Sequence, residues 1–372
     1  MCNGVSRGWF LAAAGAAALP LLAAPASGAE LPAVPDGLAA GNARAATIAR
    51  GSEFIQKQYA GAMHRAGSIA NSRIRADVLG ILTDPAPRYA RKYPTAASRT
   101  ALRDALARQG FVKPGDPVSG IFPPGTERAG IVQPFWSAAG SAYDSHHSYP
   151  GGLLVHEFFN ASMAEHFAKT YDAIYFGGGA TVDRDIAIAA AFYHDIMKTV
   201  VFQFNDDGTL LPELTIAGTG GHHCLSGAEA IVRGHDARFV TVLLSAHAAP
   251  SLGDEAKVAQ WCRASAAIAG VDPVEYGLVD RNGALAALPS IECFVNFLSD
   301  HDYVLSVEAV QRVSPLIEAL ATPPGDAEKR WWRHRVLSNA SAIALYEAAT
   351  RGEDVFEQAV RRAAAFANDT TI

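Results

Sequence analysis

The chain has 372 residues, a formal net charge of −6 at pH 7 and a pI near 6.1. That length suffices for one large domain or two smaller ones. A mildly acidic chain without basic runs is a poor nucleic-acid clamp, so we expect no long nucleic-acid partner.

The first 29 residues have the three-part layout of a secretory signal peptide. Arg7 precedes an apolar run from Trp9 to about Ala24, and residues 27–29 are small. The run is short for a membrane span of about 20 apolar residues and contains Pro20, so an uncleaved anchor is the less favoured alternative. We expect cleavage, no stable membrane insertion afterwards, and a periplasmic or secreted location.

Three cysteines follow this segment: Cys224, Cys262 and Cys293. An odd number is not a disulfide framework, even in an oxidising compartment. One bridge is possible, but the sequence does not indicate a required one.

The N-terminal third of the remaining chain alternates between helical patterns and breaks. Residues 30–45 are rich in Ala, Pro and Gly, which is typical of a linker. Apolar residues recur at helical spacing from about 45 to 80, and again from 98 to 109 until Gly110. Residues 111–130 contain several prolines and glycines, so we expect an extended connection there.

The rest of the chain is predicted to be helical with one exception. Pro150-Gly151-Gly152 opens a helix, residues 177–179 predict a turn, and another helix begins near Asp183. Asn205-Asp206-Asp207-Gly208, flanked by residues 199–204 and 210–214, predicts a β-hairpin. Further helices are predicted over residues 225–232, 237–246, 256–269, 291–304, 307–320, 327–349 and 353–366. The fold class is therefore mostly α.

Histidines and aspartates recur at inward-facing positions of these helices. The pair His194-Asp195 ends the apolar run that begins at Ile186. Burying an Asp beside a His there costs several kcal/mol unless charge or metal compensates. The other members of the pattern are His156, His223, His247 and Asp300. Imidazole and carboxylate together favour Fe, Mn, Zn or Co over Mg or Ca, so the sequence predicts a metal site.

Five separated motifs then carry a resemblance to a known family. They are Ser145-His-His-Ser-Tyr-Pro-Gly-Gly-Leu-Leu-Val-His156, His194-Asp-Ile-Met-Lys198, Gly221-His-His-Cys-Leu-Ser-Gly-Ala-Glu229, Leu244-Ser-Ala-His247 and Phe297-Leu-Ser-Asp300. In this order they resemble the HD-domain superfamily of metal-dependent phosphohydrolases, and most of all the HD domain of bacterial 3′-to-5′ exoribonucleases and relaxase-associated HD proteins. The resemblance covers about residues 140–305.

The resemblance implies a domain organisation. An HD helical bundle would occupy residues 131–322 as the metal-binding catalytic domain. A linker and N-terminal helical extension at 30–130 would precede it, and C-terminal helices at 323–372 would follow. The resemblance does not cover residues 30–130 or 323–372.

The resemblance also implies the metal ligands. His156, His194, Asp195 and Asp300 would bind the first ion, His223 and His247 the second, and Asp195 would bridge the two. His222 competes with His223, which is preferred because it stands four residues before Gly227, as the family histidine does. Asp302 is likewise an alternative to Asp300. Met197 departs from the family glycine, and His247 is single where some relatives have a pair.

Several side chains near these motifs are assigned secondary roles. Lys198 lies one helical turn beyond His194 and would stabilise charge on a phosphate; the alternative is a solvated lysine at a helix end. His146, His147 and Tyr149 are candidates for the pocket wall. His64, His166, His235, His301 and His334 follow no pattern and are expected to be ordinary histidines. Trp331-Trp332 is expected to anchor the C-terminal helices by packing.

The predicted function follows from the resemblance. We expect a secreted phosphohydrolase or phosphodiesterase, with Asp195 and Lys198 as catalytic residues, that hydrolyses a nucleotide or other small phosphate ester. Its cofactor would be two divalent ions of Fe, Mn, Co, Ni or Zn that share a hydroxide. One alternative on the same ligands is a mixed-valence di-iron oxygenase, and another is a non-catalytic metal-binding envelope protein. The oligomeric state stays open.

Overall fold

The computed structural model describes residues 29–127 and 130–365. Nearly all of the predicted signal peptide lies outside these residues. The predicted helical stretch at 45–80 is confirmed, but it is divided into three helices and starts earlier, which shortens the predicted linker. The divisions fall at Ser52 and Asn71, whose side chains accept hydrogen bonds from backbone amides of the next helix. These helices are α1 (Ala40–Arg50), α2 (Glu53–Gly67) and α3 (Ser72–Thr83), followed by η1 (Tyr89–Lys92), α4 (Ala96–Arg108), η2 (Val118–Gly120) and η3 (Phe135–Ser137).

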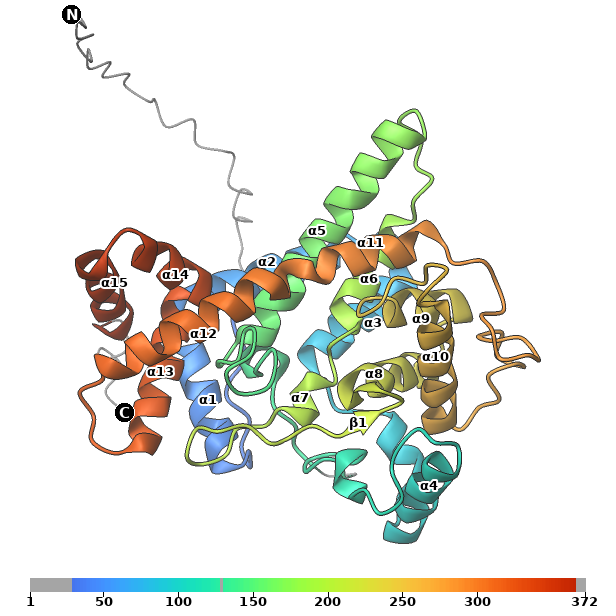
Figure 1. Ribbon diagram of the computed structural model, residues 1–372, viewed down its shortest axis with the longest axis horizontal. Coiled ribbons are helices and arrows are strands. Elements are labelled where there is room, and N and C mark those ends of the chain that lie inside the picture. The colour runs from blue at the N-terminus through green and yellow to red at the C-terminus, as the bar shows by residue number, and fades with distance from the viewer. Residues whose placement is uncertain (1–28, 128–129, 366–372) are drawn as a thin grey trace, which may run out of the picture.

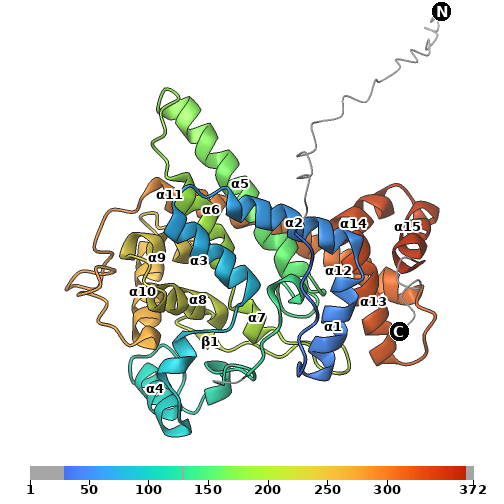
Figure 2. The ribbon, with the colours of Figure 1, turned by 180° about the vertical axis from the view of Figure 1, so that it is seen from behind.

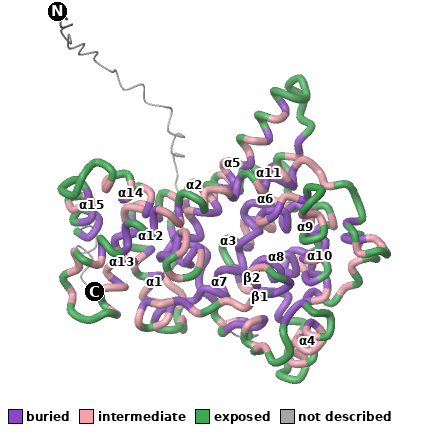
Figure 3. Tube along the Cα trace, in the orientation of Figure 1, coloured by how far each residue is buried: buried purple, intermediate pink, exposed green. Residues whose placement is uncertain are grey.

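A group of helices around a largely buried centre forms the main core (Figure 3). The long helix α5 packs against α2, α6 and α11, and α8 packs against α9 and α10. The far end of α5 projects from the rest of the molecule (Figure 1). The prediction of a mostly α-helical fold is confirmed. The bounds are α5 (Gly152–Tyr175), α6 (Arg184–Tyr193), α7 (Lys198–Val201), α8 (Gly221–Val232), α9 (Ala237–Leu244), α10 (Glu255–Ala269), α11 (Ile291–Ser299) and η4 (Asp300–Asp302).

The turn of the predicted hairpin is confirmed, but the prediction of its two strands is wrong. Residues 205–208 form a turn in which Gly208 has φ +83°, but only Phe204 and Leu210 pair across it. Residues 198–201 form the short helix α7 instead, and all four are buried. The two-stranded sheet lies further on, where β1 (Thr215–Ile216) pairs antiparallel with β2 (Thr219–Gly220). This short sheet leads directly into α8.

The C-terminal helices form a second apolar cluster that is continuous with the rest of the molecule. The helices are α12 (Tyr303–Ala319), α13 (Asp326–Ala340), α14 (Ala342–Thr350) and α15 (Glu353–Ala365). Tyr149, from the segment before α5, is fully buried in their core. Seen from behind, α13 lies beside α1 and α2 (Figure 2). The expected packing role of Trp331 is confirmed, since its side chain is buried and its Nε1 donates to the Asp206 carbonyl oxygen at 2.9 Å.

Cys224, Cys262 and Cys293 are buried free thiols, so the possible disulfide is not formed. Within residues 29–127 and 130–365, no helix combines the length and the apolar character that a bilayer crossing needs.

Candidate metal centre

The structure brings five of the six predicted ligands together, although they span residues 156 to 300. His156 comes from α5, His194 caps the C-terminus of α6, and Asp195 follows it. Asp300 caps α11, and His247 lies in the loop after α9. These side chains converge because α5, α6 and α11 pack on one another and α9 packs on α6.

One group of donors surrounds a single point between α5, α6 and α11. His156 Nε2 lies 3.2 Å from Asp195 Oδ2 and 3.1 Å from Asp300 Oδ1. His194 Nε2 lies 3.4 Å and 3.2 Å from the same two atoms. Ligands bound to one ion at about 2.0–2.2 Å are separated from each other by about this much. His156, His194, Asp195 and Asp300 therefore form one buried group suited to a metal ion.

A second group shares Asp195 with the first. His222 Nε2 lies 3.0 Å from Asp195 Oδ1, and His247 Nε2 lies 3.5 Å from the same oxygen. Asp195, His222 and His247 together could hold a second ion. Each carboxylate oxygen of Asp195 thus faces a different set of imidazoles, as expected of a bridging ligand.

The structure places His222, not the preferred His223, in the second group. His222 donates from Nδ1 to Glu213, which leaves its Nε2 as the ligand atom. His223 lies behind: its Nε2 is 3.1 Å from the Leu244 carbonyl oxygen, and its Nδ1 is 2.7 Å from His247 Nδ1. A one-residue shift turns a side chain by about 100° around a helix, so only one of the two can face Asp195.

The hydrogen bonds also set the histidine tautomers. His223 must donate Nε2–H to a carbonyl oxygen, so its Nδ1 accepts a proton from His247 Nδ1–H. His247 Nε2 is then unprotonated and faces Asp195. The neutral His194 ring likewise has an unprotonated Nε2, because its Nδ1 donates to the Ala191 carbonyl oxygen at 2.8 Å. Partners of this kind orient metal-binding histidines in proteins.

The electrostatics of the centre favour a cation. Burial opposes ionisation of Asp195 and Asp300, but the neighbouring histidines, with Lys198 beside Asp195, hold the pKa of each carboxyl well below its usual range. Burial opposes protonation of His156 as well, yet the adjacent carboxylates of Asp195 and Asp300 raise its pKa to about 9. The carboxylates are therefore ionised and compensated by imidazolium protons, which a metal ion would displace.

Buried polar atoms without hydrogen-bonding partners also indicate that this cluster suits a metal ion. Both carboxylate oxygens of Asp195 and the Nε2 of His222 are buried without a well-directed hydrogen bond. Buried polar atoms of this kind cost free energy unless water or an ion satisfies them. The donor set of imidazole and carboxylate suits divalent transition metals.

Three acidic or amide side chains that support the ligands were not identified from the sequence. Glu213 holds His222, and buried Glu157 lies with Oε2 at 3.3 Å from His194 Nδ1. Asn160 Nδ2 lies 3.2 Å from His156 Nε2 and 3.3 Å from Asp300 Oδ1. The sequence signal was available for Glu157 alone, as an acid within the apolar start of α5.

Lys198 is buried. Its ammonium pairs with Asp195 and donates to the Gly140 carbonyl oxygen at 2.6 Å. It therefore neutralises Asp195 and ties it to the segment before α5. Asp302, the alternative to Asp300, lies outside both groups and faces His147, with Oδ2 3.5 Å from Nε2.

A cavity of about 250 Å³ opens beside the centre. It exposes His247 and Asp300 and is walled by His146, as predicted, and by His301, which the sequence analysis treated as ordinary. The remaining lining residues are Ala246, Phe297 and Tyr303. Tyr149 does not line it, because its ring is buried among the C-terminal helices.

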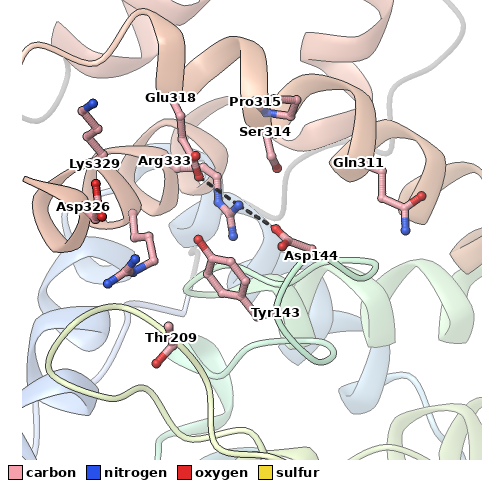
Figure 4. A pocket seen from close by; sticks show the side chains of 11 residues that line it. Tyr143, Asp144, Thr209, Gln311, Ser314, Pro315, Glu318, Asp326, Lys329 and Arg333 are labelled. Carbon is pink, nitrogen blue, oxygen red and sulfur yellow. Dashed lines mark hydrogen bonds and ion pairs between the residues drawn. The ribbon is translucent and has the colours of Figure 1, made fainter.

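The C-terminal helices hold the segment that carries His146. Arg333 of α13 donates to Asp144 Oδ1 at 2.7 Å and Glu318 Oε1 at 3.1 Å, and its guanidinium lies 4.0 Å from the centre of the Tyr143 ring (Figure 4). Further along, Ser338 Oγ donates to the Pro150 carbonyl oxygen at 2.8 Å. The segment is thus fixed at both ends by α13.

The fold and the site define a helical protein with a buried cluster of histidine and aspartate that could hold metal ions. Over 64 residues the chain is 39% identical to the dihydroneopterin 2′,3′-cyclic phosphate phosphodiesterase of Methanocaldococcus jannaschii. This similarity covers 17% of the chain and spans about a quarter, 24%, of the length of that protein. Comparison with protein families gives no match, and no solved structure matches significantly.

Proposed function

We propose that this protein is a metal-dependent phosphohydrolase of the HD superfamily that hydrolyses a small phosphate ester, either a nucleotide or a cyclic or linear diester. The observation that carries the proposal is Asp195, whose two oxygens face two separate groups of imidazoles. The short similarity to a phosphodiesterase agrees with the reaction class.

The proposed ligands would divide between two ions. His156, His194 and Asp300 would hold one, His222 and His247 the other, and Asp195 would contribute to both. When bound, such a pair supplies an activated water and neutralises charge on a phosphate ester. Asp195 would contribute one oxygen to each ion, while the Ala191 carbonyl oxygen, Glu213 and His223 orient the imidazoles.

The cavity favours a small substrate. A volume of about 250 Å³ leaves room for one phosphate group and a ring or short chain. Its lining contains no lysine or arginine, and long polyanions are bound through rows of such side chains. Lys198 takes part through Asp195, as a positioning residue that holds the carboxylate and the Gly140 backbone in place.

The proposed location is the periplasm or the outside of the cell, and it is supported by the layout of residues 1–29. N-terminal sequencing of protein from fractionated cells should give a start near Glu30. An intact Met1 in the soluble cytoplasmic fraction would contradict export, and an intact Met1 in membranes would indicate an anchor.

The activity is tested with Mn²⁺, Fe²⁺, Co²⁺, Ni²⁺ and Zn²⁺ on a panel of phosphomonoesters, linear diesters and 2′,3′-cyclic nucleotides. We expect turnover with at least one metal. Asp195→Ala should lose bound metal and turnover, because it removes a ligand of both groups. Lys198→Ala should keep its metal and turn over more slowly. Asp254→Asn, which changes an exposed acid, is the matched control. No turnover with any metal on the panel would refute the hydrolase.

A further inference from the structure

A third cluster of imidazoles lies next to the two groups already described. His146 and His147 come from the segment before α5, and their ring centres lie 4.8 and 5.2 Å from that of His156. One ring nitrogen of each of the three histidines lies within 4.8 Å of the others. His147 is buried and His146 is half-buried at the cavity wall.

The spacing of the two new histidines suits a common ligand. Their Nδ1 atoms are 3.5 Å apart. Two imidazoles bound to one tetrahedral ion at about 2.0–2.1 Å hold their nitrogens about 3.3 Å apart. Direct hydrogen bonds between nitrogens are shorter, at about 2.9–3.0 Å, so the observed spacing fits an ion better than a shared proton.

Polar groups lie near both ring nitrogens of His147. Its Nε2 lies 3.5 Å from Asp302 Oδ2 and 3.4 Å from the Ser306 hydroxyl oxygen. The hydroxyl of Ser306 lies 3.1 Å from Nδ1 and can donate to it or rotate away. A carboxylate thus stands beside His147, as Glu213 does beside His222, although at a longer distance.

His156 differs from the other imidazoles of the metal centre in the same respect. The Nδ1 atoms of His194, His222 and His247 each have a hydrogen-bonding partner. The Nδ1 of His156 is buried and has none among the described residues. An unpartnered buried nitrogen calls for water or an ion, and the nearest rings are those of His146 and His147.

The backbone that carries these two rings adopts conformations that are unfavourable for residues other than glycine. His147 adopts φ +52° and Asp144 φ +63°, a region that side chains other than glycine occupy rarely. A Cβ on Gly152 would collide with the His147 carbonyl oxygen, so the helix start can approach only as glycine. Such strain persists where surrounding structure imposes it, often at functional sites, and Arg333 imposes it here by holding Asp144 (Figure 4).

We propose that His146, His147 and His156 form a third divalent-cation site beside the bridged pair, in which His156 would bind through Nδ1 as an imidazolate whose ring proton is lost to solvent while its Nε2 faces the first ion. An all-imidazole first set of ligands selects a borderline metal such as Zn²⁺, Co²⁺ or Ni²⁺. The site opens on the same cavity through His146, where its added positive charge would bind an oxyanion such as phosphate. The site goes beyond the proposed hydrolysis and does not depend on it.

The test counts bound cobalt on the full chain. Metal-free protein is saturated with Co²⁺, freed of excess by gel filtration and analysed for metal per chain, without and with inorganic phosphate. We expect three ions in the wild type and two in His146→Gln. His301→Gln, a histidine of the same cavity wall outside the cluster, is the matched control and should keep three. His147→Asn, chosen because asparagine tolerates positive φ, should also bind one ion fewer.

The outcomes separate this site from the proposed function. Equal numbers of bound ions in the wild type and in His146→Gln, whatever the wild-type total, would overturn the third site. Anomalous scattering at the cobalt edge from wild-type crystals decides the matter if the variants fold poorly, since it places each ion directly. Turnover with only two ions would leave the hydrolase intact, and three ions without turnover would refute the hydrolase alone.

Discussion

At the candidate metal centre, three of the four imidazoles are oriented by a hydrogen-bonding partner on the second ring nitrogen. Glu213 makes Nε2 of His222 the basic atom, and the carbonyl oxygen of Ala191 does the same for His194. His223 acts on His247 in this way and so belongs to the support rather than to the ligands. A partner of this kind is typically worth a factor of 10–100 in metal affinity.

This difference between adjacent histidines gives the first prediction. His222→Gln should bind one ion fewer even at saturating metal, because it removes a ligand atom. His223→Gln should bind the full number of ions, with affinity for one of them lowered about 10–100-fold, because it removes only the orientation of His247. Metal titration followed by metal analysis distinguishes the two. A lost ion in the His223 variant with none lost in the His222 variant would restore the original preference.

The sequence was sufficient to place some residues of the candidate site but not others. His194-Asp195 could be placed because eight apolar residues precede the pair and force it inward. The choice between His222 and His223 could not be made, since it depends on Glu213, which reaches α8 across the small sheet. The catalytic role predicted for Lys198 depended on the direction of its ammonium, which donates to the Gly140 carbonyl oxygen 58 residues away.

At the scale of elements, most helix positions follow the apolar periodicity. The helix predicted over 327–349 is instead divided at Ser341 into α13 and α14, and the hairpin strands do not form as predicted. Residues 199–204 have β-branched and aromatic side chains that favour a strand, yet residues 199–201 belong to α7, which is buried and packs against α8. Tertiary packing overrides local preference here. The turn at 205–208 survives because Asn205, Asp207 and Gly208 supply its hydrogen bonds and its positive φ.

The second prediction concerns the contact between this turn and α13. Trp331→Ala should lower the free energy of unfolding by about 3–5 kcal/mol, as for other buried aromatic truncations. The residue is 1% exposed and bonds the turn through Asp206. Trp332→Ala, at a half-buried position, should cost clearly less. Urea denaturation of both variants measures the difference, and equal losses would show that Trp331 is not the anchor.

At the scale of the whole molecule, the C-terminal helices are joined to the core through buried polar groups. His334 of α13 is fully buried, and its Nε2 donates to the Gly208 carbonyl oxygen at 2.7 Å. Burial, with the charge of Arg333 beside it, lowers the pKa of His334 to about 3. The folded protein therefore keeps this ring neutral where an unfolded chain, with a pKa near 6.5, would protonate it.

The third prediction follows from the sign of that shift. The contribution of neutral His334 is full above about pH 6.5 and is lost progressively as pH falls towards 3. When the pH is lowered from 6.5 to 5, the free energy of unfolding should fall by about 2 kcal/mol through this residue. His334→Gln removes the titrating ring and should flatten the pH dependence by that amount. Denaturant unfolding at several pH values, compared between variant and wild type, tests this. Parallel curves would contradict it.

The attachment of α13 to the segment before α5 sets an order of assembly. During synthesis, the histidines at 146 and 147 emerge long before Arg333 and Ser338, which hold their segment. The pocket wall therefore cannot reach its final shape until almost the entire chain has left the ribosome. A chain truncated after α12 would retain every proposed ligand of the bridged pair. It would still lack α13, which holds the segment that forms one wall of the cavity.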